Sequence, residues 1–487
     1  MAKTKRLSLY SVFADQRMLI VLLLGFSSGL PLALTGSTLQ AWLTDGQMDV
    51  GTIGLFALVG LPYALKFVWA PFLDRYALPF LGLRRGWGII SQICLALSVA
   101  SMAFIDPIAQ IELCAGLCIL IAFFSASLDI VVDAYRTEIL DVETYGAGAG
   151  LGTTGYRLGM LVSGGVALVL ADGIISWPQV YLLMAGLCLL GAVVLLLAPE
   201  PDIKRGASSA NIRDTVVLPF LEFFQRSGAL EILLFVMIYK LSTLMATSLT
   251  TKFLLDIGYT KTLIGSTNKV AGLIATILGG LTGGAFMVKL GLKRSLWIFG
   301  LLQSIVGLTF WAMPHVAALE SGWREVGLVA VISVDNFMMG MGASAITGFM
   351  MTVCSLQFTG TQFALFTSLT AVTRVILVAQ AGNIVAKIGW GNFFLGTVPL
   401  AIPGLLLLTR FDQWQKPSST VKKRIGVFDQ ITIGVFLFSL LALSSDPLWR
   451  WLGEKDLGQQ VVFAGALGIV GVIAAGLLKP AFERRFS

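Results

Sequence analysis

The sequence predicts an all-α membrane protein of fourteen spanning helices, arranged as two related six-helix bundles followed by one further pair. Three observations predict this fold: the composition, a series of long apolar runs and a weak internal repeat. Of the 487 residues, 56% are apolar and 13% are charged, whereas about a quarter of the residues in a soluble domain are charged. A chain of this length with so little charge lacks the polar surface of a soluble enzyme, so that class is excluded.

The apolar runs set the number of spans. Each run is long enough to cross a bilayer as a helix, which takes about 20 residues, and none shows the strict alternation of a β-barrel strand. The runs lie at residues 18–42, 52–73, 87–105, 110–133, 147–171, 179–198, 229–254, 263–289, 295–313, 326–352, 362–386, 392–409, 427–445 and 461–479.

Two basic connections divide these runs into six, six and two. The first connection contains Ile212–Arg226, which suits either an amphipathic helix on the inner leaflet or a simple linker. We therefore expect five segments: a bundle at 1–198, a cytoplasmic linker at 199–228, a second bundle at 229–410, a linker at 411–426 and an additional helix pair with the C-terminal tail at 427–487.

An internal repeat supports this division. GTIG at 51–54 aligns with TLIG at 262–265, and a similar alignment of later helices places Arg157 opposite Arg374. Repeated six-helix halves with a substrate bound between them near the middle of the membrane are typical of secondary transporters. The repeat therefore favours a transporter with a central cavity.

The positions of Lys and Arg predict the orientation. With a cytoplasmic N-terminus, the inner segments hold 23 of the 34 basic residues and the outer loops hold five. Basic residues concentrate on the cytoplasmic side of membrane proteins. We therefore expect a multi-pass protein of the cytoplasmic membrane with both termini inside the cell.

Several polar and basic residues lie within the spans, where a charge normally faces a cavity or a partner charge. The central cations outnumber the central acids, so we expect an anionic small-molecule substrate. The alternative is that buried pairs, such as Asp129 with Arg157 and Asp335 with Arg374, hold helices together. The candidate substrate-binding residues are Gln40, Lys66, Arg157, Lys240, Lys269, Arg374, Gln380 and Asn383.

Acidic residues within the spans are candidates for proton coupling. Asp129 and Asp133 are one helical turn apart on the fourth run. Two such carboxylates in a partly dry site do not both ionise easily, which makes the pair a plausible proton carrier. Arg136, one turn further on, is an alternative anchor for Asp133, which would make Asp133 structural. Asp335 is the candidate in the second half.

Other classes of chemistry have little support in the sequence. The only histidine is His315, and the five cysteines all fall inside apolar runs, so we expect no metal site and no disulfide framework. The basic residues are dispersed over short loops, which argues against nucleic acid as a partner. No phosphate-binding loop is present. We expect the protein to be a monomer, to need no cofactor and not to be an enzyme. We expect it to take its energy from the proton gradient.

Specific stretches give the chain a family resemblance. LDRY…RRGW between the second and third runs resembles the cytoplasmic loop signature of the major facilitator superfamily. This loop, with its repeat at 286–297, is our candidate for conformational gating, through Asp74, Arg75, Arg84, Arg85, Lys289, Lys293 and Arg294. A more specific resemblance is to the AmpG-type muropeptide permeases, through LGFSSGLPLALTGSTLQAWL, YALKFVWAPFLDRY, SASLDIVVDAYRTEIL, GYRLGMLVSGG and TQFALFTSLTAVTR.

The resemblance implies a function that composition and spacing do not. It implies import of anhydromuropeptides, which are N-acetylglucosaminyl-anhydromuramoyl peptides, across a bacterial inner membrane for peptidoglycan recycling. It also implies a link to β-lactamase induction, dependence on the proton gradient and a role for Asp129, which lies in the matching SASLDIVVDA stretch. Two alternatives stay open: transport of another anionic conjugate, such as an acyl-coenzyme A or a siderophore, and a sensor or scaffold that binds muropeptide without moving it.

Overall fold

The computed structural model describes residues 9–79, 81–203, 212–226, 228–378 and 381–415. Within these ranges the chain forms helices joined by short turns, with one isolated bridge between Leu78 and Gly82. The two spans predicted at 427–445 and 461–479 lie outside the described residues. Ten of the described helices are long and apolar enough to cross a membrane.

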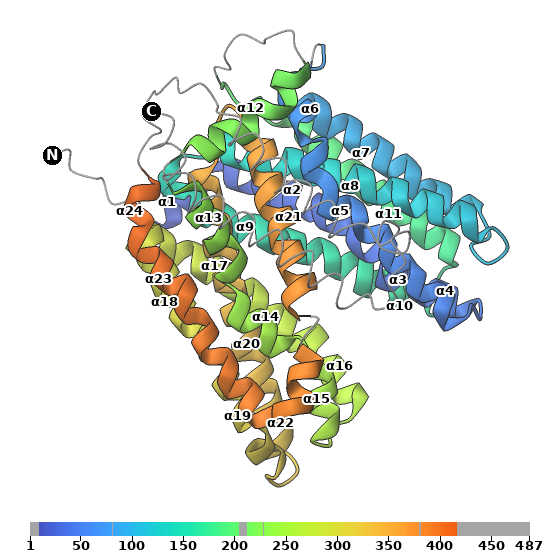
Figure 1. Cartoon of the computed structure of the whole chain (residues 1–487). Helices are drawn as coiled ribbons and strands as arrows, with labels where there is room; N and C mark the ends of the chain where they lie inside the picture. Colours follow the sequence, from blue (N-terminus) through green and yellow to red (C-terminus); the bar gives the residue numbers. More distant parts are fainter. Residues whose placement is uncertain (1–8, 80, 204–211, 227, 379–380, 416–487) are drawn as a thin grey trace, which may run out of the picture. The chain divides into compact units, whose positions relative to one another are not determined.

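The helices fall into two compact units (Figure 1). The first unit contains the described residues up to 203, with 277–295 and 343–365, and the second contains the described residues of 212–276, 296–342 and 366–415. The first eleven α-helices of the chain all lie in the first unit. They are α1 (Leu9–Phe13), α2 (Gln16–Leu34), α3 (Ser37–Asp45), α4 (Val50–Leu55), α5 (Leu61–Leu65), α6 (Ala70–Arg75), α7 (Arg84–Ser101), α8 (Ile111–Ile139), α9 (Tyr145–Leu161), α10 (Ala167–Ala171) and α11 (Trp177–Leu197).

The second half of the sequence continues the series, and four of its helices, α17, α18, α20 and α21, contribute residues to both units. The helices are α12 (Ile212–Gln225), α13 (Ala229–Ile238), α14 (Leu241–Thr247), α15 (Thr250–Asp256), α16 (Lys261–Thr267), α17 (Leu273–Leu290), α18 (Leu292–Ser304), α19 (Val306–Ala317), α20 (Trp323–Val353), α21 (Thr359–Val378), α22 (Ala381–Thr397), α23 (Ile402–Leu407) and α24 (Phe411–Trp414).

The second apolar run is not the single helix that the sequence predicts. The chain from Val50 to Arg75 is divided into α4, α5 and α6, with tighter 3₁₀ turns at 56–60 and 66–68, although Figure 1 shows the three helices following one another along one path. Pro62 and Pro71 lie at the starts of α5 and α6. Because proline has no N–H and its ring clashes with the preceding turn, it kinks or breaks an α-helix, which accounts for the division at these positions.

Glycines allow α2 and α9 to approach at backbone distance. A Cβ atom added at Gly155 would lie 2.1 Å from the Leu22 carbonyl oxygen, and one added at Gly29 would lie 2.1 Å from the Tyr156 carbonyl oxygen. Small residues permit such close helix packing in membranes, where the association of helices depends on van der Waals contact. The glycine pattern GYRLGMLVSGG therefore serves the packing of the first unit.

The predicted repeat is visible in the backbone at the ends of the first and seventh spans. The Met48 N–H donates to the Leu43 carbonyl at 3.0 Å, and the Tyr259 N–H donates to the Leu254 carbonyl at 3.0 Å. The residues before these donors, Gln47 with φ 59° and Gly258 with φ 91°, both adopt positive φ. Leu43, Gln47 and Met48 precede Leu254, Gly258 and Tyr259 by 211 positions. The same separation aligns GTIG with TLIG.

The packing of α2 on α9 predicts the effect of one added methyl group. Gly155→Ala is expected to cost about 1–3 kcal/mol of stability, because its Cβ overlaps a backbone carbonyl that cannot move independently. The measurement is the thermal unfolding of purified protein in detergent, followed by tryptophan fluorescence.

The matched control for this substitution is Gly116→Ala on α8. A Cβ at Gly116 meets nothing within 4 Å, so this change is expected to leave stability unchanged or to raise it by up to about 1 kcal/mol. Equal unfolding temperatures for the two variants would contradict the proposed close contact.

Candidate functional site

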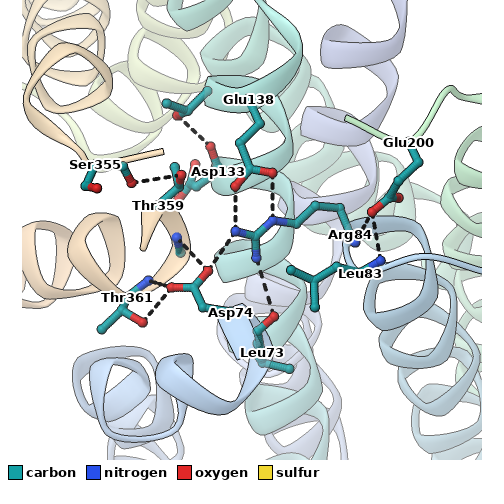
Figure 2. A network of polar contacts seen from close by, with 12 residues as sticks. Leu73, Asp74, Leu83, Arg84, Asp133, Glu138, Glu200, Ser355, Thr359 and Thr361 are labelled. Carbon is teal, nitrogen blue, oxygen red and sulfur yellow. Dashed lines mark hydrogen bonds and ion pairs between the residues drawn. The ribbon is translucent and has the colours of Figure 1, made fainter. Parts of the chain in front are cut away.

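A buried arginine organises the loop between the second and third spans (Figure 2). The Arg84 side chain is fully buried. Its Nη2 lies 2.7 Å from Asp74 Oδ1 and 2.6 Å from Glu138 Oε1, and its Nε donates to Glu138 Oε2 at 3.0 Å. The fork of the guanidinium matches the Glu138 carboxylate with two parallel hydrogen bonds, which is the strongest geometry for such a pair.

Asp74 also receives the start of α21. The Gly360 N–H donates to Asp74 Oδ1 at 3.0 Å, and the Thr361 N–H and hydroxyl both donate to Asp74 Oδ2 at 2.6 Å. A carboxylate at a helix N-terminus satisfies N–H groups that have no partner within the helix and interacts favourably with the helix dipole. Asp74 therefore joins α6 to α21 and at the same time neutralises Arg84.

Glu200 plays a similar part at the start of α7. Its Oε1 accepts from the Leu83 N–H at 2.7 Å and the Arg84 N–H at 2.8 Å, and its Oε2 accepts from the Arg85 N–H at 2.9 Å. Glu138, Glu200 and Thr361 are functional candidates that the sequence interpretation missed. The available signal was an acidic residue near the predicted cytoplasmic end of each of two spans, opposite a basic loop.

The other predicted gating residues are less buried than Arg84. Arg85 donates from Nε to the Leu195 carbonyl at 2.9 Å, and the Arg75 guanidinium carbon lies 5.8 Å from the centre of the Tyr76 ring. The repeat of this loop holds Lys289 and Arg294, which are exposed, and Lys293, which is half-buried. The structure thus brings Asp74, Arg84 and Arg85 into one network, while Lys289 and Arg294 of the second loop are exposed.

An ion pair within the predicted membrane region joins the second and fourth spans. Lys66 is buried, and its Nζ lies 3.7 Å from Asp129 Oδ2. The Ser28 hydroxyl of α2 donates to Asp129 Oδ1. The sequence suggested Asp129 with Arg157 as a buried pair, and the ion pair that the structure shows for Asp129 is with Lys66. Arg157 is half-buried.

Asp133 has the alternative partner that the sequence suggested. Its Oδ1 lies 2.7 Å from Arg136 Nη2, one turn further along α8. The Arg136 guanidinium also lies 5.6 Å from the centre of the Phe363 ring at the start of α21. This arrangement favours a structural role for Asp133, whereas Asp129, one turn away, faces Lys66 and Ser28.

The second unit contains its own acid–base pair. Asp335 of α20 is buried, with 6% of its surface exposed, and its Oδ1 accepts no hydrogen bond within the described part of the chain. Lys240 is its electrostatic neighbour and lies at the break between α13 and α14. The alternative pairing of Asp335 with Arg374 is therefore replaced by Lys240, and Arg374 is exposed.

The remaining candidates do not join these pairs. Gln40 on α3, Lys269 in a π-helical turn at 268–272, and Asn383 on α22 are all exposed, and Gln380 lies outside the described residues. The described residues contain no group of three or more side chains suited to a metal ion.

The Arg84 network predicts a large effect of one substitution. Arg84→Gln is expected to destabilise the protein by about 3–5 kcal/mol, because it removes the partner of two buried carboxylates. The matched control is Lys289→Gln, which changes an exposed charge of the repeated loop and is expected to leave the unfolding temperature unchanged. Thermal unfolding in detergent measures both, and an unaltered unfolding temperature for Arg84→Gln would contradict the network.

Comparison with known proteins identifies the family. The family model described as Major Facilitator Superfamily matches residues 21–378. The anhydromuropeptide permease of Escherichia coli strain K12 is 45% identical over 398 residues, which cover 82% of this chain and 80% of that protein. The putative transporter AmpG 4 of Rickettsia conorii is 34% identical, over 82% of this chain and 97% of that protein.

Solved structures agree on the fold. The crystal structure of the major facilitator superfamily transporter FucP in the outward conformation is similar with a TM-score of 0.62 and 14% identity, over 80% of this chain and 97% of that chain. The relatives are permeases and transporters, and the described helices include ten long and apolar enough to span a membrane. The chain is therefore a multi-pass membrane protein of the major facilitator superfamily, in the family of the anhydromuropeptide permeases.

Proposed function

We propose that this protein imports anhydromuropeptides from the periplasm to the cytoplasm of a bacterium, by alternating access and in symport with protons. The observation that carries the proposal is the 45% identity to an anhydromuropeptide permease over most of both chains. In this proposal the protein lies in the inner membrane as a monomer with both termini in the cytoplasm, needs no cofactor and serves peptidoglycan recycling.

The buried cations support an anionic substrate. Lys66 is buried with one acidic neighbour, and Lys240 lies at a break between two helices. Broken helices are characteristic of transporter binding sites, because their ends leave polar backbone groups available within the membrane. The carboxylates of a stem peptide suit such lysines, and the half-buried Arg157 with the exposed Gln40, Arg374 and Asn383 would complete the recognition.

The Lys66–Asp129 pair suggests how protons are coupled to the substrate. When Asp129 is ionised, its carboxylate holds the Lys66 ammonium and accepts the Ser28 hydroxyl. When Asp129 binds a proton, its attraction for Lys66 falls, so Lys66 becomes available to a substrate carboxylate. Proton and anion would therefore bind together. Asp335 with Lys240 is the corresponding candidate in the second unit.

Substrate recognition is tested by uptake into proteoliposomes. Lys66→Gln is expected to raise the muropeptide concentration for half-maximal counterflow about tenfold or more, since a charge-assisted hydrogen bond contributes about 1.5–3 kcal/mol. Lys387→Gln, which removes an exposed lysine outside the candidate site, is the control and should behave as wild type. The absence of counterflow in the wild type would indicate a scaffold, and competition by an acyl-coenzyme A or a siderophore would indicate another cargo.

Proton coupling is tested separately with Asp129→Asn. This variant should lose concentrative uptake driven by an imposed pH gradient but retain counterflow, because exchange of substrate for substrate requires no net proton movement. Concentrative uptake by Asp129→Asn at the wild-type rate would overturn the assignment of Asp129.

A further inference from the structure

The first and seventh spans both end in a separate short helix. α3 follows α2 after a break at Gly36, where φ is −110° and ψ is −111°, and α15 follows α14 after a break at Leu249, where φ is −116° and ψ is 18°. Such breaks interrupt the helical hydrogen-bond series, and hinges are generally residues at the ends of elements. The predicted topology places both short helices at the outer face of the membrane.

In the first unit, α3 is fastened to the start of α11. The indole Nε1 of Trp177 donates to Asp45 Oδ2 at 3.0 Å. The Trp177 ring stacks on Trp42 with centroids 6.0 Å apart and an interplanar angle of 13°, and Trp42 lies 5.0 Å from the Tyr181 ring. One charge-assisted hydrogen bond and two ring contacts therefore hold the end of α3.

In the second unit, α15 is fastened to α22 in the same way. The indole Nε1 of Trp390 donates to Asp256 Oδ2 at 3.3 Å. The Phe253 ring lies 5.1 Å from the Trp390 ring and 4.7 Å from the Phe394 ring. Trp390 directly follows a kink at Gly389, whose φ of 75° turns the chain into the twelfth span.

The two arrangements occupy equivalent positions in the repeat. Trp42 and Asp45 precede Phe253 and Asp256 by 211 residues, and Trp177 and Tyr181 precede Trp390 and Phe394 by 213 residues. Tryptophans are common at membrane interfaces as anchors, but anchoring alone does not require each indole to donate to an aspartate at the end of another helix. The repeated hydrogen bond points to a shared mechanical role.

We propose that α3 and α15 are hinged outer gates, each held by a tryptophan–aspartate clasp to the last span of its own half. The clasps are Asp45–Trp177 and Asp256–Trp390, and their release lets each short helix turn about its break. Gln40 on α3 and Thr251 on α15 are exposed at equivalent positions, so movement of the gates displaces groups that can contact cargo. The gating role rests on the proposed transport function, whereas the clasp itself does not.

Hydrogen exchange measured by mass spectrometry tests the clasps in purified protein without substrate. Trp177→Phe keeps an aromatic ring but removes the donor, and it should make the amides of α3 exchange about fivefold faster while α15 is unchanged. Trp390→Phe should produce the reverse pattern. Trp414→Phe is the control, because Trp414 donates to Glu231 Oε2 at 2.8 Å, away from α3 and α15. This variant should leave both short helices at the wild-type rate.

Two results would overturn the clasps. Unchanged exchange of α3 in Trp177→Phe would show that the hydrogen bond does not hold this helix. Faster exchange spread over α2, α8 and α11 would show that Trp177 is a core residue whose loss loosens the whole unit. Because no muropeptide is present in this experiment, its result tests the two hydrogen bonds even if the proposed transport function is wrong.

Chemical cross-linking tests the gates. Cysteines replacing Asp45 and Trp177 together, joined by a short flexible bismaleimide, should fix α3 and stop muropeptide counterflow. Each variant with only one of the two substitutions, which keeps the same five native cysteines, should continue to transport after treatment with the same reagent. Counterflow at the wild-type rate in the cross-linked protein would overturn the gate, while counterflow that is missing before cross-linking would instead contradict the proposed function.

Discussion

Charge neutralisation within a low-dielectric interior is the constraint on which this structure depends. A charged side chain in the hydrocarbon region costs at least a few kcal/mol unless it meets a partner or water. Arg84 illustrates the solution at the predicted cytoplasmic edge, where Asp74 and Glu138 surround a guanidinium that has no exposed surface. The same carboxylate of Asp74 then receives the start of α21. One buried cation thereby fixes the positions of α6, α7, α8 and α21.

The buried pairs nearer the middle of the spans have fewer and longer contacts than the Arg84 network. Arg84 meets its carboxylates at 2.6–2.7 Å, whereas Lys66 and Asp129 are 3.7 Å apart. Asp335 leaves one oxygen without a hydrogen bond among the described residues. A loose pair is more easily separated by a proton or by a competing anion. The geometry therefore supports a structural role for Arg84 and the proposed substrate-binding role for Lys66.

Ten of the predicted spans correspond to described helices long and apolar enough to cross a membrane, because composition and length are enough to recognise such a helix. The partners of the charges were harder to predict. Depth along a helix can be counted in residues, but rotation about each helix axis decides which side chains meet, and this rotation brings Lys66 next to Asp129, for which the sequence had suggested Arg157. Glu138 lies 54 residues after Arg84, and no local pattern specifies that distance. The division of the second span required knowing how far Pro62 and Pro71 bend the chain.

The repeat distinguishes what the two halves share from what each half does. The ends of the first and seventh spans agree in backbone hydrogen bonds, in positive φ and in the donor–acceptor pair that fastens them. The buried ion-pair residues do not repeat: at the separation of 211 residues, Lys66 corresponds to Ile277, and Asp335 corresponds to Phe124. Duplicated geometry with unlike charges suits the asymmetric cargo of the proposed function. Each half can make the same movement while contacting a different part of a molecule that has a sugar at one end and a peptide at the other.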